Sequence, residues 1–184
     1  VIGFPFGALS SKEKTDEVKA AVADGADELD MVMNIGAALD GRFNDVETDI
    51  AAVVKASVSA GEKVGKKIIV KVILETCFLD DATLVTCCQC AQKAGADFVK
   101  TSTGFASPKG IDGSQLPNGA SVHHVTLMRK TVGPDMGVKA SGGIHSSRTA
   151  VSMLNAGANR IGTSSGTKLI DTWDESIKIK GWDD

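Results

Sequence analysis

The sequence predicts an α/β fold built on a parallel sheet, and three observations carry this prediction. Short β-branched runs alternate with amphipathic segments along all 184 residues, without a break in composition. Runs such as residues 68–70 and 72–74 are apolar on both faces, as strands of a parallel sheet covered by helices must be. The Gly-x-Gly-x-x-Gly turn of a dinucleotide-binding sheet is absent, so a TIM (β/α)8 barrel is favoured over an open doubly wound sheet.

The strand candidates are short apolar runs bounded by turn residues. Six are expected, at residues 1–4, 27–33, 67–74, 98–101, 137–140 and 159–162. A helix candidate follows each of them, which is the order expected of successive βα units.

The helix candidates begin with caps and end at glycines. Ser10 followed by Glu13 is a capping box that opens the first helix. Gly25, Gly95 and Gly157 each stand just before a strand, where a left-handed helix C-terminus is favoured. The other helices are expected at residues 44–60, 81–94, 120–131 and 146–156 and from about residue 164.

Length and charge limit the function classes. One domain covering residues 1–184 is expected, because 19.0 kDa suffices for one sizeable core. The formal charge of −3 is too balanced for nonspecific binding to nucleic acid. No run approaches the ~18 apolar residues of a membrane span and no signal-peptide pattern opens the chain, so a cytoplasmic protein without a membrane partner is expected. Since Val1 already belongs to a strand candidate, we expect that upstream sequence is missing.

The cysteines and histidines do not predict a metal site. The cysteines are Cys77, Cys87, Cys88 and Cys90. One Cys-x-x-Cys pair is present, but no second ligand pair stands at zinc-site spacing, so buried, reduced side chains are expected. His123 and His124 are adjacent on a helix, and no acid or third ligand lies near them in sequence. We therefore expect no metal.

Ionisable residues interrupt four of the apolar strands near their C-terminal ends. They are Asp30, Lys71, Lys100 and Lys139. Burying a charge is costly, and the catalytic groups of a barrel lie at the C-terminal ends of its strands. The four side chains are therefore expected to converge on one small volume. A single lysine at a strand end would more simply reach the solvent at the rim, but equivalent positions on four strands argue against coincidence.

Amine catalysis is the chemistry that uses such a cluster. A lysine with the reference pKa of ~10.4 is almost fully protonated at pH 7 and cannot attack a carbonyl. A second ammonium group nearby and partial desolvation both favour the neutral amine, and a shift of ~3 units corresponds to about 4 kcal/mol. An aspartate beside the two amines could relay a proton.

Glycine and hydroxyl residues follow the same strands and predict a phosphate site. Gly142 and Gly143 follow the strand of Lys139, and a Gly-Thr-Ser-Ser segment opens the last helix, so backbone N–H groups and hydroxyls can gather around an anion. Barrels commonly bind phosphate with the loops after strands seven and eight. The six strands would then be the third to the eighth of the barrel.

Six segments together resemble the deoxyribose-phosphate aldolase family, whose members are class I aldolases on a TIM barrel. In chain order they read VIGFP, ELDMVMN, KVILET, VKTSTG, VKASGG and RIGTSS. The resemblance runs from Val1 to about Ile170, and the pairing of VKTSTG with VKASGG is highly specific. It implies a lyase of deoxyribonucleotide catabolism, a form of carbohydrate degradation. That lyase would reversibly cleave 2-deoxy-D-ribose 5-phosphate to acetaldehyde and D-glyceraldehyde 3-phosphate without a cofactor.

The resemblance also implies roles for individual residues. Lys100 would form the Schiff base, Lys139 would lower the pKa of Lys100, and Asp30 would serve in proton transfer. Substrate binding is expected at Lys71, Thr101, Gly104, Gly142, Gly143, Gly162, Ser164 and Ser165.

The chain departs from the family pattern in three places. The first two βα units of the barrel are missing, and His145 follows the Gly-Gly pair where many members have Arg. Residues 105–119 are long and rich in Gly and Pro, which suits a mobile flap or an inserted loop. Two other interpretations stay open: a non-catalytic phosphosugar-binding barrel, and a different lysine-dependent phosphosugar aldolase or transaldolase. Exposed sheet edges favour a homo-oligomer, most simply a homodimer.

Overall fold

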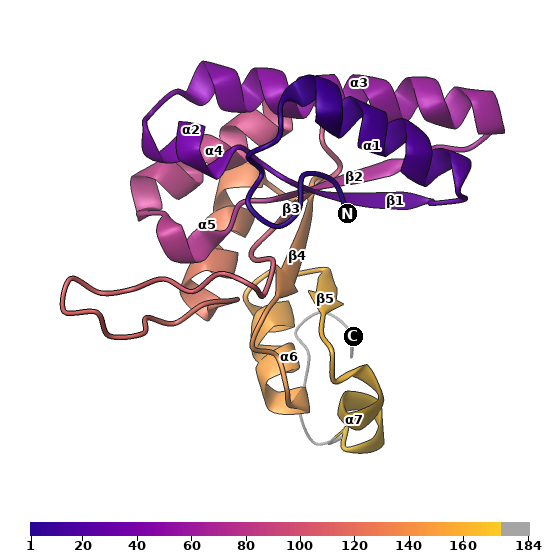
Figure 1. Cartoon of the computed structure of the whole chain (residues 1–184). Helices are drawn as coiled ribbons and strands as arrows, with labels where there is room; N and C mark the ends of the chain where they lie inside the picture. Colours follow the sequence, from indigo (N-terminus) through magenta and orange to yellow (C-terminus); the bar gives the residue numbers. More distant parts are fainter. Residues whose placement is uncertain (174–184) are drawn as a thin grey trace.

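The structure is a computed structural model that describes residues 1–173, and it contains a five-stranded parallel sheet with helices packed against it (Figure 1). The strands are β1 (Glu28–Val32), β2 (Ile69–Ile73), β3 (Phe98–Lys100), β4 (Gly137–Ser141) and β5 (Arg160–Gly162). The helices are α1 (Ser11–Ala23), α2 (Ile35–Leu39), α3 (Phe43–Val64), α4 (Asp81–Lys93), α5 (Val122–Val132), α6 (Ser147–Asn155) and α7 (Gly166–Asp171), with a 3-10 turn at Thr76–Phe78. The strand order follows the chain order, as in part of a barrel wall, and confirms the predicted parallel α/β fold.

The predicted strand at residues 1–4 is wrong, because only Ile2 pairs with the sheet. The Ile2 amide donates to the Asp30 carbonyl at 2.9 Å, and the Val32 amide donates to the Ile2 carbonyl at 2.9 Å. Gly3 then adopts a left-handed φ of 64°, which turns the chain away from β1 after a single pair. The sheet of the described residues therefore has five strands, with a one-residue bridge at Ile2 beside β1.

The helices differ from the predicted ones mainly at their ends. The capping box is confirmed: the Ser10 hydroxyl accepts a hydrogen bond from the Glu13 amide, and the Glu13 carboxylate accepts one from the Ser10 amide at 2.9 Å. Helix α3 continues past Gly61 to Val64 and ends at Gly65, whose φ of 67° is left-handed. Helix α2 was not predicted, because five residues are too short to show a helical period.

The helices form a single layer that follows the curve of the sheet. Along this layer, α1 packs on α3, α3 on α4, α4 on α5 and α5 on α6. Figure 1 shows the strands turning progressively from β1 to β4, with the helices outside the turn. Among residues 1–173, no helix combines the length and apolar character that a membrane crossing requires.

Alternation along the strands separates the core from the functional side chains. Residues such as Met31, Val72, Val99 and Val138 are fully buried in the core. Because strand side chains alternate between faces, the residues between them lie on the other face of the sheet. The parallel register places Asp30 beside Lys71 and Lys100 beside Lys139. The fold therefore gathers the predicted charged residues on one face.

A buried ion pair joins α1, α3 and the end of β1. The Lys14 ammonium lies 2.5 Å from a carboxylate oxygen of Asp49 and also donates to the Val32 carbonyl at 3.0 Å. The Ser11 hydroxyl donates to the other Asp49 oxygen at 2.7 Å. The Lys14 side chain is entirely buried, so this pair is part of the core.

The cysteines are free and mostly buried, as predicted. Cys87, Cys88 and Cys90 lie on α4 with their side chains buried, and Cys77 is half-buried. Burial raises the pKa of the Cys87 and Cys88 thiols to about 12, which keeps both protonated near neutral pH.

Candidate active site

Asp30 is the centre of the charged cluster. Its Oδ2 atom accepts hydrogen bonds from the ammonium groups of Lys100 at 2.8 Å and of Lys139 at 2.7 Å. Its Oδ1 atom accepts one from Lys71 at 2.9 Å. Since Lys100 and Lys139 share one oxygen atom, their nitrogens are close neighbours although they come from different strands. The predicted convergence of four strand-end charges is thus present.

Burial and charge oppose each other in this cluster. Asp30 is mostly buried, and desolvation alone would raise its pKa, but hydrogen bonds from Lys100, Lys139 and Lys71 hold the pKa well below its usual range. The pKa of Lys139 is lowered, chiefly by desolvation. The contact with Asp30 raises the pKa of Lys139 and so opposes the shift, whereas the positive charges of Lys100 and Lys71 lower it further. The surroundings of Lys139 therefore shift its titration toward lower pH than that of a free lysine.

A second carboxylate, Glu28, extends the cluster. Its Oε2 atom lies 2.7 Å from the Lys71 ammonium and also accepts a hydrogen bond from Arg160. The Arg160 guanidinium lies over the ring of Phe98, 5.2 Å from the ring centroid. Sequence reasoning missed Glu28 and Arg160. The signal was the strand period, because Glu28 lies two residues before Asp30 and Arg160 is the register partner of Lys139.

A cavity of about 570 Å³ opens beside the cluster. Of the predicted site residues, Lys100, Lys139, Gly104, Gly142, Gly143, Gly162 and Ser164 line it. The remaining lining residues are Thr103, Phe105, Asn118, Ser141, Ile144, His145 and Thr163. Both key lysines thus open onto the same space as the glycine loops.

Three predicted substrate-binding residues lie outside the lining of this cavity. Thr101 is fully buried, and its hydroxyl donates to the Ser141 carbonyl and accepts from the Ser141 amide, both at 3.0 Å. Lys71 is engaged by Asp30 and Glu28. The Ser165 hydroxyl lies 3.3 Å from His145 Nδ1. In this structure Thr101 therefore joins β3 to β4 and does not face the cavity.

Close backbone approaches explain two of the glycines around the cavity. A Cβ atom on Gly119 would lie 2.7 Å from the Gly142 carbonyl oxygen, so only glycine allows these two loops to touch. A Cβ atom on Gly162 would lie 2.9 Å from Ser141 Cβ and 3.2 Å from Lys139 Cε. Gly162 thus leaves the room that the Lys139 side chain occupies.

Glu75 holds the loop after β3 through Thr103 and forms no ion pair with a lysine among residues 1–173. It is almost fully buried, at 1% exposure, and has a left-handed φ of 54°. Both carboxylate oxygens lie 3.2 Å from the Thr103 amide, and Oε2 also accepts from the Thr103 hydroxyl. Burial raises the pKa of Glu75, while the bonds from Thr103 oppose that shift.

Residues 105–119 form a hairpin that projects from the body of the molecule (Figure 1). Lys109 and Gln115 form its antiparallel bridge. At its base, Phe105 lines the cavity and packs edge-on against Phe4, with ring centroids 5.3 Å apart. The hairpin is therefore attached to the rim of the candidate site.

Another hollow lies between α1 and α3. It measures about 630 Å³, and its lining combines small apolar residues with Lys19, Lys55 and Lys63. Its lining contains no carboxylate, and it contains none of the predicted site residues. We therefore assign the chemistry to the smaller cavity beside Asp30.

Comparisons with known proteins point to one family. Residues 4–171 match the model of the DeoC/LacD family aldolase. The chain is 53% identical over 171 residues to the deoxyribose-phosphate aldolase of Thermococcus kodakarensis, covering 93% of this chain and 69% of that protein.

Two solved structures are similar in fold as well as in sequence. One is a putative deoxyribose-phosphate aldolase from Coccidioides immitis, with a TM-score of 0.80, 40% identity, and coverage of 92% of this chain and 61% of that one. The other is the tetrameric deoxyribose phosphate aldolase from Aeropyrum pernix, with a TM-score of 0.79, 36% identity, and coverage of 96% and 67%. The chain thus spans roughly two thirds of the length of these relatives.

Proposed function

The chain belongs to the DeoC/LacD family of aldolases, in agreement with the predicted family and lyase class, and from that membership we propose its reaction. The reaction is the reversible Schiff-base cleavage of 2-deoxy-D-ribose 5-phosphate into acetaldehyde and D-glyceraldehyde 3-phosphate. The observation that carries the proposal is the pair of amines, Lys100 and Lys139, on one oxygen of Asp30 at the wall of a cavity. Such a pair is what amine catalysis requires.

Lys100 is the proposed nucleophile. Its side chain is 10% exposed and reaches the cavity, so its amine can meet a bound carbonyl. Attack on the aldehyde carbon C1 and loss of water give an iminium ion. Removal of the C3 hydroxyl proton then breaks the C2–C3 bond, releases glyceraldehyde 3-phosphate and leaves an enamine. Protonation at C2 and hydrolysis release acetaldehyde and restore the amine.

Asp30 and Lys139 are the proposed partners of Lys100. Lys139 supplies a second amine on the same Asp30 oxygen as Lys100, next to the proposed nucleophile. Asp30 contacts both nitrogens and can pass protons between them and the substrate, directly or through water. Lys71 balances the charge of the cluster through Asp30 and Glu28.

The phosphate group is proposed to bind where the glycine loops line the cavity. Gly142, Gly143 and Ser164 belong to this lining, and backbone amides and a hydroxyl group are suitable anion ligands. His145 adds an imidazole at the same rim. We keep the proposal that the five described strands lie among the third to the eighth strands of a TIM (β/α)8 barrel.

Location and assembly remain proposals. The tetrameric relative from Aeropyrum pernix supports a homo-oligomer, and we retain the homodimer as the form to test by light scattering. A cytoplasmic location is proposed from the reduced, buried cysteines.

Reductive trapping tests the proposed function. Incubation with acetaldehyde and borohydride should attach a two-carbon adduct to the protein, and peptide mapping should place it on Lys100. The variant Lys100→Arg keeps the positive charge and should remain unmodified. If the mass of the wild-type protein does not change while 2-deoxyribose 5-phosphate still binds, the non-catalytic interpretation is correct and the aldolase proposal fails.

A further inference from the structure

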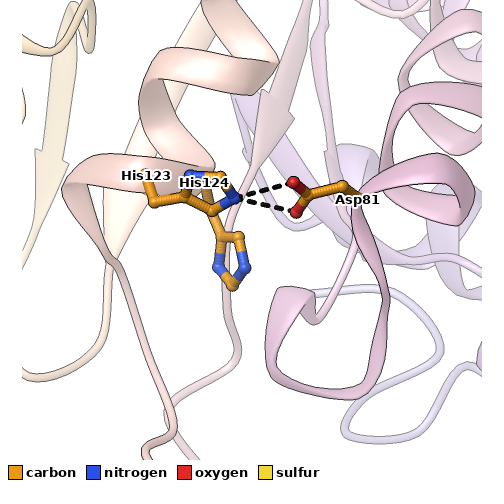
Figure 2. A group of neighbouring side chains, drawn as sticks. All are labelled: Asp81, His123 and His124. Atoms are coloured by element: carbon orange, nitrogen blue, oxygen red, sulfur yellow. Dashed lines mark hydrogen bonds and ion pairs between the residues drawn. The ribbon is translucent and has the colours of Figure 1, made fainter.

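Three metal-binding side chains meet outside the candidate active site. Asp81 is the first residue of α4, and His123 and His124 lie in the first turn of α5. One ligand atom from each residue lies within 4.8 Å of the others (Figure 2). Within residues 1–173, these three form the one group of His, Cys, Asp and Glu side chains that meets this geometry. None of them touches the lysine cluster.

Spacing along the chain does not indicate this group, because Asp81 lies 42 positions from His123. The packing of α4 against α5 brings them together. Nε2 of His123 lies 2.8 and 2.9 Å from the two oxygens of Asp81, as Figure 2 shows. A hydrogen bond between exposed side chains explains this pair, but it leaves His124 unused.

His124 supplies a second, independent observation. Its Nδ1 atom is shielded from solvent and has no hydrogen-bond partner among the described residues. Buried polar atoms are normally satisfied, and an exception calls for an ion or an ordered water. The rings of His123 and His124 are tilted by 57° with centroids 5.4 Å apart, so they are not stacked face to face.

We propose that Asp81, His123 and His124 bind a divalent transition-metal ion, with Zn²⁺ the best fit. Two imidazoles and a carboxylate are ligands that Zn²⁺ accepts, with water completing the tetrahedron at this exposed position. Ligand atoms at ~2.0–2.1 Å from a tetrahedral ion stand about 3.4 Å apart. The His123–Asp81 contact must therefore open by roughly half an ångström, which these two exposed side chains can do.

The bound ion would brace two loops of the candidate site. Helix α4 begins shortly after Glu75, and α5 begins directly after the hairpin that starts beyond Thr103. An ion that joins the starts of α4 and α5 would hold these two loops in register. It would act on stability and take no part in the aldol chemistry.

Zinc titration of the whole chain, first stripped with a chelator, tests the site. Competition with a chromophoric chelator should give one Zn²⁺ per chain, and Zn²⁺ should raise Tm. His124→Gln and Asp81→Asn should each weaken binding at least about tenfold, in line with the loss of a zinc ligand. His145→Gln is the matched control, because the sequence has three histidines and His145 is the one outside the group.

The outcomes separate the site from alternatives. Each variant is first compared with the wild type in Zn²⁺-free buffer, where an equal Tm and circular dichroism spectrum show that it is folded. Loss of binding in folded His124→Gln with binding retained in His145→Gln supports the site. Equal affinity of the wild type and His124→Gln, or no stoichiometric binding by the wild type, would overturn the proposal and leave a plain His123–Asp81 hydrogen bond.

Discussion

The buried carboxylate of Glu75 accepts hydrogen bonds from both the amide and the hydroxyl of Thr103. These residues lie 28 positions apart, one after β2 and the other after β3. Thr103 lines the cavity, whereas Glu75 does not. Glu75, which lies outside the cavity lining, therefore sets the position of Thr103, which belongs to the lining.

Replacing Glu75 should disturb substrate binding more than chemistry. In Glu75→Ala the Thr103 amide and hydroxyl lose their partner, so the loop should loosen and KM for the phosphosugar should rise about tenfold, with kcat less affected. Glu75→Gln keeps an acceptor oxygen and should recover part of the loss. Steady-state kinetics of both variants would measure this split, and an unchanged KM in Glu75→Ala would contradict the assigned role.

Replacing Lys100 and replacing Lys139 should have different effects on turnover and on adduct formation. Lys100→Met removes the proposed nucleophile, so both turnover and the borohydride adduct should disappear. Lys139→Met keeps the nucleophile but removes a neighbouring charge and a proton carrier, so turnover should fall by about 10²–10⁴ while some adduct still forms on Lys100. Mass spectrometry after trapping distinguishes the two, and an adduct on Lys139 in either protein would reverse the assignment.

Asp30 should link stability to acid pH. Its folded-state pKa is lowered, so its contribution to stability is present above the unfolded value of ~3.9 and is lost as pH falls below it. Asp30→Asn removes this contribution, so its stability should depend less on pH in that window than the wild type's. It should also lower kcat/KM by about 10²–10⁴. Urea unfolding between pH 3 and 7 measures how the free energy of unfolding of each protein depends on pH. The same dependence in the wild type and Asp30→Asn would contradict the prediction.

The buried Lys14–Asp49 pair should be costly to break from one side. Lys14→Met leaves the Asp49 carboxylate buried without its cation, which should destabilise the fold by about 3–5 kcal/mol. The double variant Lys14→Met, Asp49→Leu removes both charges and should recover much of that loss. Denaturant unfolding of the two variants provides the comparison. Similar losses in both would mean that packing around Lys14, not charge, sets the cost.

Gly162 should matter because of the space it leaves for Lys139. In Gly162→Ala the new methyl group would lie 3.2 Å from Lys139 Cε and 2.9 Å from Ser141 Cβ, so the amine should shift and kcat/KM should fall about tenfold. Gly166→Ala is the control, because its Cβ would meet no atom within 4 Å. Comparable activity in the two variants would remove the steric argument.

Patterns that repeat along the chain could be predicted from the sequence. The parallel α/β fold, five of the six strands and the convergence of Asp30 with three lysines follow from alternation, caps and the rule that strand ends meet at one edge. These features depend on local composition and on one topological rule. The strand at residues 1–4 failed because the turn at Gly3 decides where pairing stops, and apolar composition does not report it.

Long-range partners were beyond sequence reasoning. The strand period could place Glu28 on the face of Asp30, but its pairing with Arg160, like that of Asp81 with His123, depends on packing between distant elements. Thr101 belongs to a motif that predicts substrate binding, but both hydrogen bonds of its hydroxyl go to the backbone of Ser141 on β4. Motifs identify the residues of a site, but packing decides which of them face the substrate.

The bond between Arg160 and Glu28 joins the last named strand to the first. This side-chain contact connects the two outermost strands of the curved sheet, so it helps to set the curvature of the sheet. Glu28 also forms an ion pair with Lys71, so the same carboxylate affects both the curvature of the sheet and the charge balance of the lysine cluster. A substitution at Glu28 would therefore alter both the curvature of the sheet and the reactivity of the lysine cluster.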